Sequence, residues 1–260
     1  MAHDDGRIYA PDCNEADEAP ELDNVLQMPQ TKRFNVGPDY DYLDSGWHAA
    51  MWREIWRGLA SIVLRPLNAA AFGLEIRGKE NLWALESGAV VVANHVHPMD
   101  CTFLDTLLWD RRTYYATLEA NFRIPVVRHL IKALGGVPVP ENFRYLPAFR
   151  DGMKQALEAG SYVCIYPEGV LRPYYGGLRR FRDGAFMIAA EAKAPVLPVV
   201  ITFRHPDGLT AIYKKKPCIT VTVLPPVYPE EGNTVREECR RMKQTCFSEM
   251  KERLNREDAS

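Results

Sequence analysis

The sequence has few cysteines and no long apolar run, and both absences limit what the protein can be. Its six cysteines lie far apart and form no CxxC pair, so we expect reduced thiols of a cytoplasmic protein rather than a disulfide framework. No apolar run approaches the roughly 20 residues of a membrane-spanning helix. The first residues are acidic and lack the apolar segment of a signal peptide. Any association with a bilayer is therefore expected to be peripheral.

A strong excess of either charge is also absent. The formal net charge is -2 at pH 7, whereas a general nucleic-acid-binding protein usually has a clearly basic balance. Acidic side chains are concentrated near the start, where residues 1–24 contain eight of them and one basic side chain, Arg7. We therefore predict no nucleic-acid partner, and an acidic, flexible N-terminal tail over residues 1–45.

The following residues, 46–256, are predicted to form one α/β domain. The chain of 260 residues is 47% hydrophobic and 25% charged, which suits a single core. Strands are predicted at 74–78, 89–94, 113–118, 161–167, 195–203 and 218–224, and helices at 98–110, 126–134, 147–160, 184–193 and from 235 onward. The last helix should bury a face formed by Val235, Cys239, Met242, Cys246 and Met250. The alternation predicts a central, mostly parallel or mixed sheet flanked by helices on both faces.

Residues 47–64 form a predicted amphipathic helix for which two roles stay open. Arg53 and Arg57 lie opposite an apolar face. That face comprises Trp52, Ile55, Trp56, Leu59, Ile62 and Val63. The helix either packs on the core in the usual way or lies in a membrane interface, with its tryptophans at the level of the lipid headgroups.

The segment NHVHPMD, residues 94–100, places two histidines and an aspartate directly after a predicted buried strand. Loops at the carboxyl ends of strands are the usual ligand-binding positions of such sheets. His95, His97 and Asp100 could bind a metal ion, although their spacing departs from the HxHxDH pattern of the metallo-β-lactamases. His95 could instead act as a general base that Asp100 orients. A structural histidine beside a helix-capping aspartate is the third interpretation.

Several segments, in order, resemble the motifs of the glycerolipid acyltransferase family typified by 1-acylglycerol-3-phosphate acyltransferase. NHVHPMD resembles the first motif of that family, NHx4D. LGGVPVPEN at 134–142, YPEGVLR at 166–172 and VLPVVI at 196–201 resemble the second, third and fourth motifs, and FRDGAF at 181–186 resembles a further family segment. The similarity extends over about residues 74–203 and implies a glycerol-3-phosphate acyltransferase-like fold.

The resemblance implies an O-acyltransferase of phospholipid biosynthesis that uses no metal or cofactor. His95 would deprotonate the hydroxyl of an acceptor, Asp100 would orient His95, and the hydroxyl would attack the thioester of acyl-CoA or acyl carrier protein. Glu168, Gly169 and Arg172 would bind the acceptor. The first candidate acceptor is 1-acylglycerol-3-phosphate, which would give phosphatidic acid. The enzyme would work as a peripheral protein at the cytoplasmic face of the membrane.

Two departures from the family's motifs leave the acceptor open. Val170 and Leu171 stand where the third motif usually has Thr-Arg, and the arginine follows one place later as Arg172. Glu141 stands where the second motif often has an arginine, and a carboxylate there would repel a phosphate. Arginines that could compensate are Arg144, Arg172, Arg179, Arg180 and Arg182. Another lysophospholipid, or a lipid with a free hydroxyl, is therefore an alternative acceptor.

Two other functions also stay open. One is a metal-dependent hydrolase that uses His95, His97 and Asp100. The other is a lipid-binding member of the fold without catalytic activity, since two acceptor motifs are altered. For the acyltransferase, a lipid substrate requires an amphipathic entrance. We expect that entrance to be formed by the helix at 47–64 with Phe122, Arg123, Arg128 and Lys132.

Overall fold

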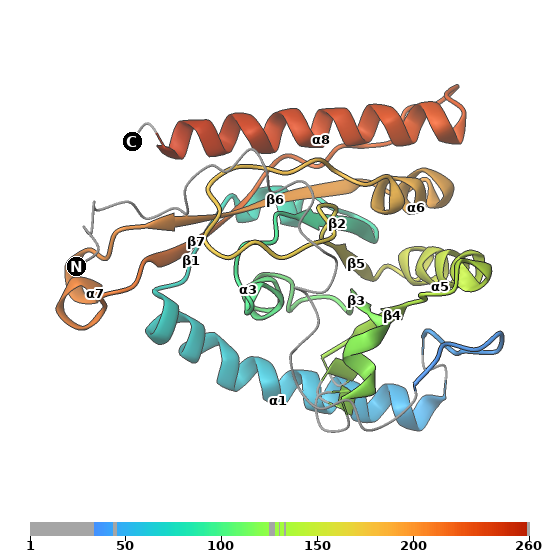
Figure 1. Ribbon diagram of the computed structural model, residues 1–260, viewed down its shortest axis with the longest axis horizontal. Helices are drawn as coiled ribbons and strands as arrows, with labels where there is room; N and C mark the ends of the chain where they lie inside the picture. Colours follow the sequence, from blue (N-terminus) through green and yellow to red (C-terminus); the bar gives the residue numbers. More distant parts are fainter. Residues whose placement is uncertain (1–33, 44–45, 125–127, 130, 133, 259–260) are drawn as a thin grey trace.

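A seven-stranded sheet occupies the centre of the molecule (Figure 1). The computed structural model describes residues 34–43, 46–124, 128–129, 131–132 and 134–258. Its strands are β1 (Glu75–Arg77), β2 (Ala89–Ala93), β3 (Thr113–Leu118), β4 (Gly136–Val139), β5 (Tyr162–Ile165), β6 (Val196–Arg204) and β7 (Cys218–Val223). They lie in the order β1-β7-β6-β2-β5-β3-β4, and every neighbouring pair is parallel except the antiparallel pair β6 and β7. The predicted mixed, mostly parallel sheet is confirmed.

Helices cover both faces of this sheet. The α-helices are α1 (Trp47–Phe72), α2 (Lys79–Trp83), α3 (Asp100–Leu107), α5 (Leu146–Glu158), α6 (Gly184–Ala192), α7 (Gly208–Tyr213) and α8 (Val235–Asp258), and the 3-10 helices are η3 (Glu119–Arg123) and η4 (Phe143–Tyr145). The sequence did not predict β4, α2 or α7. The helix predicted at 126–134 includes residues outside the described part of the chain.

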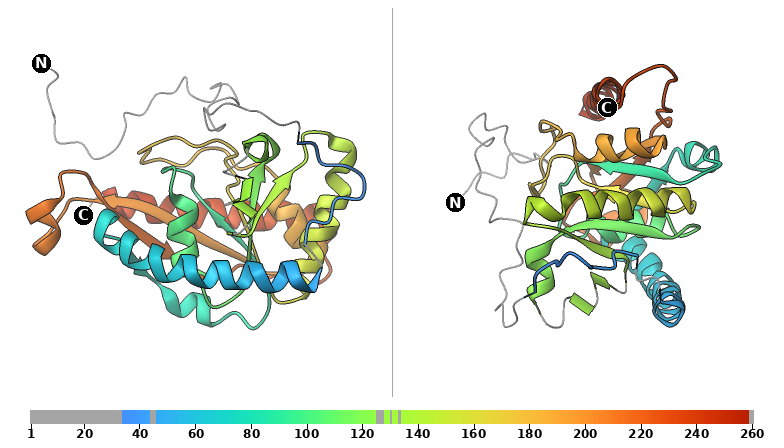
Figure 2. Two further views of the ribbon diagram at one scale, coloured as in Figure 1. Left: turned by 90° about the horizontal axis from the view of Figure 1, so that it is seen from below. Right: turned by 90° about the vertical axis from the view of Figure 1, so that its right-hand side faces the viewer.

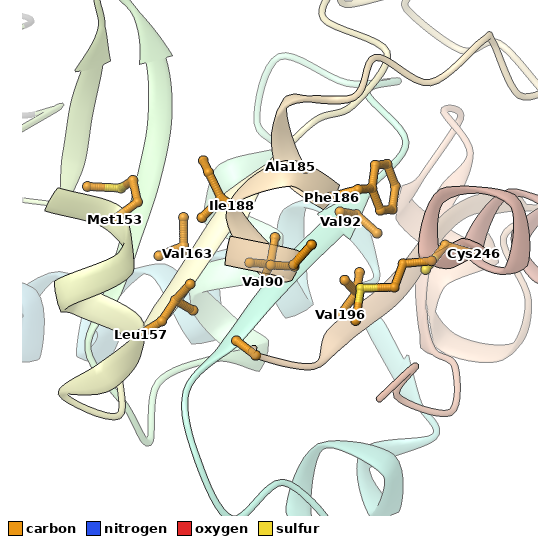
Figure 3. Packing of buried hydrophobic residues seen from close by; sticks show 14 of the residues in the cluster. Val90, Val92, Met153, Leu157, Val163, Ala185, Phe186, Ile188, Val196 and Cys246 are labelled. Carbon is orange, nitrogen blue, oxygen red and sulfur yellow. The ribbon is translucent and has the colours of Figure 1, made fainter. Parts of the chain in front are cut away.

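The residues of β2 divide the core into two halves, because successive side chains of a strand point to opposite faces. Val90 and Val92 pack on one side with residues of α5, α6 and α8, as Figure 3 shows. Val91 and Ala93 pack on the other side with residues of α2 and α3. All five residues of β2 are buried. The uninterrupted apolar run in the sequence therefore reflects a central strand that is covered on both faces.

Helix α8 buries one apolar face, as its sequence predicts. Cys239, Met242, Cys246 and Met250 are each at most 4% exposed. Val235, at the start of the predicted face, is instead 42% exposed. It is the first residue of the helix, so it lies beyond the part of α8 that packs on the core.

Helix α1 packs outside α3 and is longer than the predicted helix at 47–64. Apart from a ring contact between Phe72 and Phe103, 5.0 Å between centroids, its contacts with α3 are hydrogen bonds of polar side chains. The fully buried Asn68 side chain donates to the Thr102 carbonyl and to Thr106 Oγ1, both at 2.9 Å. Ser61 Oγ donates to Asp105 Oδ2 at 3.2 Å. Expectations of a helix packed through its apolar face are therefore wrong.

The apolar side chains of α1 face away from the protein. They are Trp47, Met51, Trp52, Ile55, Trp56, Leu59, Ile62, Val63 and Leu67, with exposed fractions between 44% and 71%. Figure 2 shows the helix lying along the outside of the molecule. The side chain of Arg53, which the sequence placed opposite this face, lies outside the described part of the structure. No helix in the described ranges is long and apolar enough to cross a bilayer.

Residues 34–43 lie on the core although they precede the domain boundary predicted at residue 46. Val36 and Tyr42 are 4% and 7% exposed, and the Val36 amide donates to Glu119 Oε1 at 2.9 Å. The folded domain thus includes part of the segment that was predicted to be a flexible tail. Residues 1–33 lie outside the described part. The flexibility of the acidic tail and the reduced state of Cys13 therefore stay predictions. The other five cysteines are free thiols.

Candidate active site

The histidine loop and the Pro-Glu-Gly turn meet at one edge of the sheet. Strand β2 lies between β5 and β6 and is parallel to both. The segments that follow β2 and β5 therefore leave the sheet at the same edge. His95 follows β2, and Tyr166 follows β5. The chain order alone did not reveal that these two strands are neighbours.

Asn94 anchors the start of the histidine loop to β6. It is fully buried, its side-chain nitrogen donates to the Ile201 carbonyl at 2.9 Å, and its side-chain oxygen accepts from the Ile201 amide at 2.8 Å. Ile201 ends the fourth motif, so this amide joins the first motif to the fourth. The sequence analysis gave Asn94 no role. An amide directly after a wholly apolar strand was the available signal, since a buried amide needs hydrogen-bond partners.

His95 and Asp100 form a hydrogen-bonded pair. His95 Nδ1 lies 2.9 Å from Asp100 Oδ2, and the same oxygen accepts from the amides of Val96 at 2.8 Å and His97 at 3.0 Å. Asp100 begins α3 and its side chain is fully buried, whereas the His95 side chain is 22% exposed. With Nδ1–H donating to the carboxylate, the basic nitrogen is Nε2. The pair has the geometry expected of a general base and its orienting partner.

Tyr166 stacks on His95, a contact that the sequence analysis missed. The two ring centroids are 4.2 Å apart and the rings are inclined by 15°. Tyr166 is the first residue of the third motif, directly after β5. Its ring holds one face of the imidazole while Asp100 holds its edge, so the orientation of His95 is set from two directions.

His97 is enclosed rather than available to a ligand. It is 9% exposed, and the rings of Phe72, Phe103 and Tyr174 lie within 5.7 Å of its own, centroid to centroid. Its Nδ1 accepts from the Met99 amide at 3.1 Å. Burial lowers the pKa of the imidazole, and Lys216 and Lys214 lower it further, against the opposing effect of Asp100. We expect a neutral side chain that shapes the wall of the site.

The geometry gives the metal interpretation no support. Among the described residues, no group of three or more His, Cys, Asp and Glu side chains is arranged to hold a metal ion. Asp100 Oδ2 already accepts three hydrogen bonds, and His97 Nδ1 accepts one. These two atoms are therefore occupied by protein donors, while Asp100 Oδ1 has no hydrogen-bond partner among the described residues.

The Pro-Glu-Gly turn requires glycine at position 169. Gly169 has φ +73°, in the left-handed region that other residues rarely adopt. A side chain there would also approach Arg182, whose Nε would lie 2.9 Å from an added Cβ. The Arg182 amide donates to the Pro167 carbonyl at 2.8 Å. The glycine thus lets an arginine of the next segment lie directly over the turn.

Glu168 is a buried carboxyl surrounded by arginines. It is 4% exposed, and neither of its oxygens has a side-chain hydrogen-bond partner among the described residues. Burial raises its pKa to about 8, while Arg179 and Arg172 favour the charged form and Asp100 disfavours it. At neutral pH the group is therefore mostly protonated. The turn combines a neutral carboxyl with the positive charges of Arg172, Arg179 and Arg182.

Arg172 connects the turn with the histidine loop. Its amide donates to the His95 carbonyl at 2.9 Å, and the Tyr174 amide donates to the Val96 carbonyl at 2.8 Å. The Arg172 guanidinium lies over the Tyr175 ring, 4.1 Å from the centroid. The structure thus brings together all five residues that the sequence analysis assigned to the site: His95, Asp100, Glu168, Gly169 and Arg172.

The second motif differs from what its sequence suggested. Glu141 is paired with Arg123, whose Nη2 lies 2.6 Å from Glu141 Oε2 and 4.0 Å from Glu119 Oε1. Phe122 is fully buried and stacks on Phe34 at 5.3 Å, so it cannot line an entrance for lipid. That part of the predicted entrance is wrong, because residues 34–43 cover it. Lys132 lies over the Tyr40 ring of the same segment, 5.6 Å from its centroid.

Comparison with known proteins gives a consistent result. Residues 73–202 match the protein family described as Acyltransferase. The chain is 30% identical over 197 residues to BAT2, a chloroplastic 1-acyl-sn-glycerol-3-phosphate acyltransferase from Brassica napus. The match covers 72% of this chain and 52% of that protein. It is 31% identical over 173 residues to 1-acyl-sn-glycerol-3-phosphate acyltransferase beta from Homo sapiens, covering 61% of this chain and 59% of the relative. The chain thus spans about half the length of these relatives.

A solved structure supports the fold. The crystal structure of the 1-acyl-sn-glycerophosphate acyltransferase PlsC from Thermotoga maritima matches with a TM-score of 0.53 at 22% identity, covering 82% of this chain and 85% of that one. At this identity the likeness concerns the fold alone. The family match extends over all four motifs, of which the first, third and fourth meet in the structure. The chain therefore belongs to the glycerolipid acyltransferase family.

Proposed function

We propose that the protein is an O-acyltransferase that moves an acyl chain from an acyl thioester to the hydroxyl of a lysophospholipid. The observation that carries the proposal is the hydrogen bond between His95 Nδ1 and Asp100 Oδ2, 2.9 Å long, at the carboxyl end of the central strand. Family membership supports it. The first candidate acceptor is 1-acylglycerol-3-phosphate, and either acyl-CoA or acyl carrier protein can present the thioester.

The reaction follows from the orientation of His95. Its Nε2 takes the proton of the acceptor hydroxyl as the hydroxyl oxygen attacks the thioester carbonyl. The buried Asp100 carboxylate stabilises the imidazolium that forms. The tetrahedral intermediate then expels the thiolate, which receives the proton from His95. The products are the ester and the free thiol, and a thioester is reactive enough for this transfer to need only positioning and a base.

The surroundings of Glu168 support an acidic acceptor. Arg179 and Arg172 act electrostatically on Glu168, and the Arg182 guanidinium lies against Gly169. Guanidinium groups bind phosphate through paired hydrogen bonds. A protonated Glu168 adds a donor and no negative charge. Glu141, which would repel a phosphate, is paired with Arg123.

The test is release of free thiol from palmitoyl-CoA across a panel of acceptors, with His95→Ala beside the wild type. We expect release that depends on 1-acylglycerol-3-phosphate and that falls by roughly 10² to 10⁴ in the variant. Release with an uncharged acceptor only would contradict the phosphate site. Equal rates for wild type and His95→Ala, with both donors, would favour the inactive lipid-binding member. Full activity in a chelator is expected, and its loss would revive the metal-dependent hydrolase.

The pH dependence of transfer tests Glu168 separately. Its pKa of about 8 keeps the group neutral below that pH, so the rate should fall as the pH rises through about 8 and the ionised carboxylate repels the phosphate. Glu168→Gln keeps a neutral side chain at every pH and should lose this alkaline decline. An unchanged decline in Glu168→Gln would assign it to another group.

We also propose that α1 docks the protein on the cytoplasmic face of a membrane. The exposed apolar face of α1 includes three tryptophans, a residue type enriched at lipid headgroups. Arg65 and Arg57, which lie on its other side, are held by the protein: Arg65 lies 4.3 Å from the Trp109 ring centroid, and Arg57 donates to the Arg111 carbonyl. Both arginines thus lie against the protein, so the apolar side is the one left to meet lipid.

Vesicle binding tests this docking. Val63 is 62% exposed on α1 and Val235 is 42% exposed on α8, so the same change, valine to serine, can be made at both. We expect Val63→Ser to weaken binding by about threefold to tenfold and Val235→Ser to leave it unchanged. Equal effects of the two substitutions would argue against α1 as the docking helix, while the chemistry at His95 would stand.

A further inference from the structure

Helix α7 is a second apolar projection at the same edge of the sheet as His95. It follows β6, which is parallel to β2, so the segments after both strands leave at one edge. Figure 1 shows α7 beyond the end of the sheet, next to the end of α1. Leu209 and Ile212 are each 80% exposed, and Tyr213 is 59% exposed. Among the large apolar side chains of the described ranges, Phe143 at 84% is more exposed than Leu209 and Ile212.

The C-terminal end of α1 holds α7 in place. Tyr213 donates its hydroxyl hydrogen to the Ala70 carbonyl at 3.0 Å, and Lys214 Nζ donates to the Ala71 carbonyl at 2.6 Å. Arg204, at the end of β6, bonds both the Gly73 carbonyl at 2.8 Å and Asp207 Oδ1 at 2.9 Å. The left panel of Figure 2 shows α7 continuing beyond α1. These bonds fix α7 to the C-terminal end of α1, beyond the exposed apolar face that runs from Trp47 to Leu67.

Three lysines follow α7 directly. Lys214 is tied to α1, whereas Lys215 and Lys216 are exposed. Lys214 and Lys216 also act electrostatically on His97, which is two residues from His95 in the histidine loop. The basic segment therefore follows the exposed apolar tip and is near enough to the histidine loop to act on His97. Positive charge beside exposed aliphatic side chains is complementary to an anionic lipid surface.

We infer that α7 and Lys215–Lys216 form a second membrane contact, which selects anionic bilayers and presses the edge that carries His95 against the lipid. Leu209 and Ile212 enter the headgroup region, and the two lysines pair with lipid phosphates. The inference rests on the docking of α1 proposed above. With α1 alone the protein would attach to any bilayer; with α7 it attaches at two points and prefers negative charge.

An anionic bilayer fits these residues better than an acidic protein. Both would attract the lysines. Helix α7, however, presents Leu209 and Ile212 at 80% exposure and is bonded to the end of α1 through Tyr213 and Lys214. It also continues the apolar surface of α1, which is too long for a small carrier domain to cover alone. We therefore assign the surface to lipid, and an acidic carrier protein becomes an outcome of the test.

The experiment measures flotation with vesicles of phosphatidylcholine and with vesicles that also contain phosphatidylglycerol, at low and high salt. The variant is Lys215→Gln with Lys216→Gln, which leaves the structural Lys214 intact. Its matched control is Lys79→Gln with Lys251→Gln, two exposed lysines on α2 and α8. We expect about tenfold to thirtyfold weaker binding of the variant to anionic vesicles at low salt, with no change on neutral vesicles and none in the control. Leu209→Ser with Ile212→Ser should weaken binding to both kinds of vesicle.

Each failure has a separate meaning. An anionic preference that persists in the lysine variant overturns the role of α7 and leaves α1 docking and acyl transfer untouched. Wild-type protein that binds neither kind of vesicle overturns both docking proposals. Unchanged vesicle binding with weaker binding of purified acyl carrier protein would overturn the lipid assignment in favour of a protein partner. The readout needs no acyl transfer, so an inactive protein would still test the surface.

Discussion

The two longest helices of the described ranges are α1, with 26 residues, and α8, with 24. They lie on opposite faces of the sheet and turn different sides inward, as Figure 1 and the buried residues show. Helix α8 turns its apolar side chains to the core, where Met242 and Met250 are fully buried. Helix α1 turns polar side chains inward: Asn68 is fully buried against α3, while Ile62 is 71% exposed. The amphipathic pattern of α8 assigned it to the core, whereas that of α1 left core packing and a membrane interface both open.

The comparison shows that the inward side of an amphipathic helix depends on what lies beneath it. Beneath α8 lie α6 and β6, whose side chains are apolar. Beneath α1 lies the outer side of α3, which presents the Thr102 carbonyl, Thr106 and Asp105. Buried polar groups need partners, and the polar side of α1 provides them. The apolar side is then available for lipid.

The largest effect on folding is expected from the buried face of α8. Met242→Ala should lower the free energy of unfolding by about 2 to 5 kcal/mol, because it removes a fully buried side chain and leaves a cavity. Urea denaturation measures the change. Arg240→Ala, on the exposed side of the same helix, is the control and should cost no more than about 0.5 kcal/mol. Similar losses for both would remove the contrast between the two sides of α8.

A smaller loss is expected from the polar anchor of α1. Asn68→Ala should lower the free energy of unfolding by about 1 to 3 kcal/mol, because it removes the hydrogen bonds that Asn68 donates to the Thr102 carbonyl and to Thr106 Oγ1. The neighbouring Leu67 is 48% exposed, so Leu67→Ala should change the free energy of unfolding far less. A larger loss from Leu67→Ala than from Asn68→Ala would mean that α1 packs through its apolar side.

The same interface should give the folding stability a pH dependence. Burial raises the pKa of Asp105, against the weaker effects of Ser61, Arg57 and Arg65. The folded protein therefore binds the proton more tightly than the unfolded chain, whose aspartate has a pKa of about 3.9. This stabilisation is complete below that pKa and is lost as the pH rises through the raised value. Asp105→Asn should flatten this part of the profile in urea denaturation, and an unchanged slope would contradict the assignment.

The smallest effect on folding is expected from the outer face of α1. Trp52→Ser with Trp56→Ser should change the free energy of unfolding by no more than about 0.5 kcal/mol without lipid, because both side chains are more than half exposed. Vesicle binding should fall by at least about tenfold. Loss of stability without loss of vesicle binding would reverse the comparison between α1 and α8.

Much of the site was accessible from the sequence, because its motifs are local. His95 and Asp100 are five residues apart, and a helix beginning at Asp100 brings its carboxylate back to the loop amides. Gly169 stands in a turn that needs its left-handed conformation. The stacking of Tyr166 on His95 was not accessible, because it depends on β2 and β5 being neighbours. The pairing of Glu141 with Arg123 likewise depends on how η3 meets the second motif.

The sequence by itself determined the family, the mixed α/β sheet and the five residues of the candidate site, because periodicity and short motifs are properties of contiguous segments. Only the tertiary structure decided which side of α1 faces inward, that residues 34–43 cover Phe122, and that α7 extends the apolar end of α1. Each of these depends on the polarity of a surface built by distant segments. The sequence of a helix shows that it has an apolar and a polar side, but the surface on which the helix packs decides which side is buried.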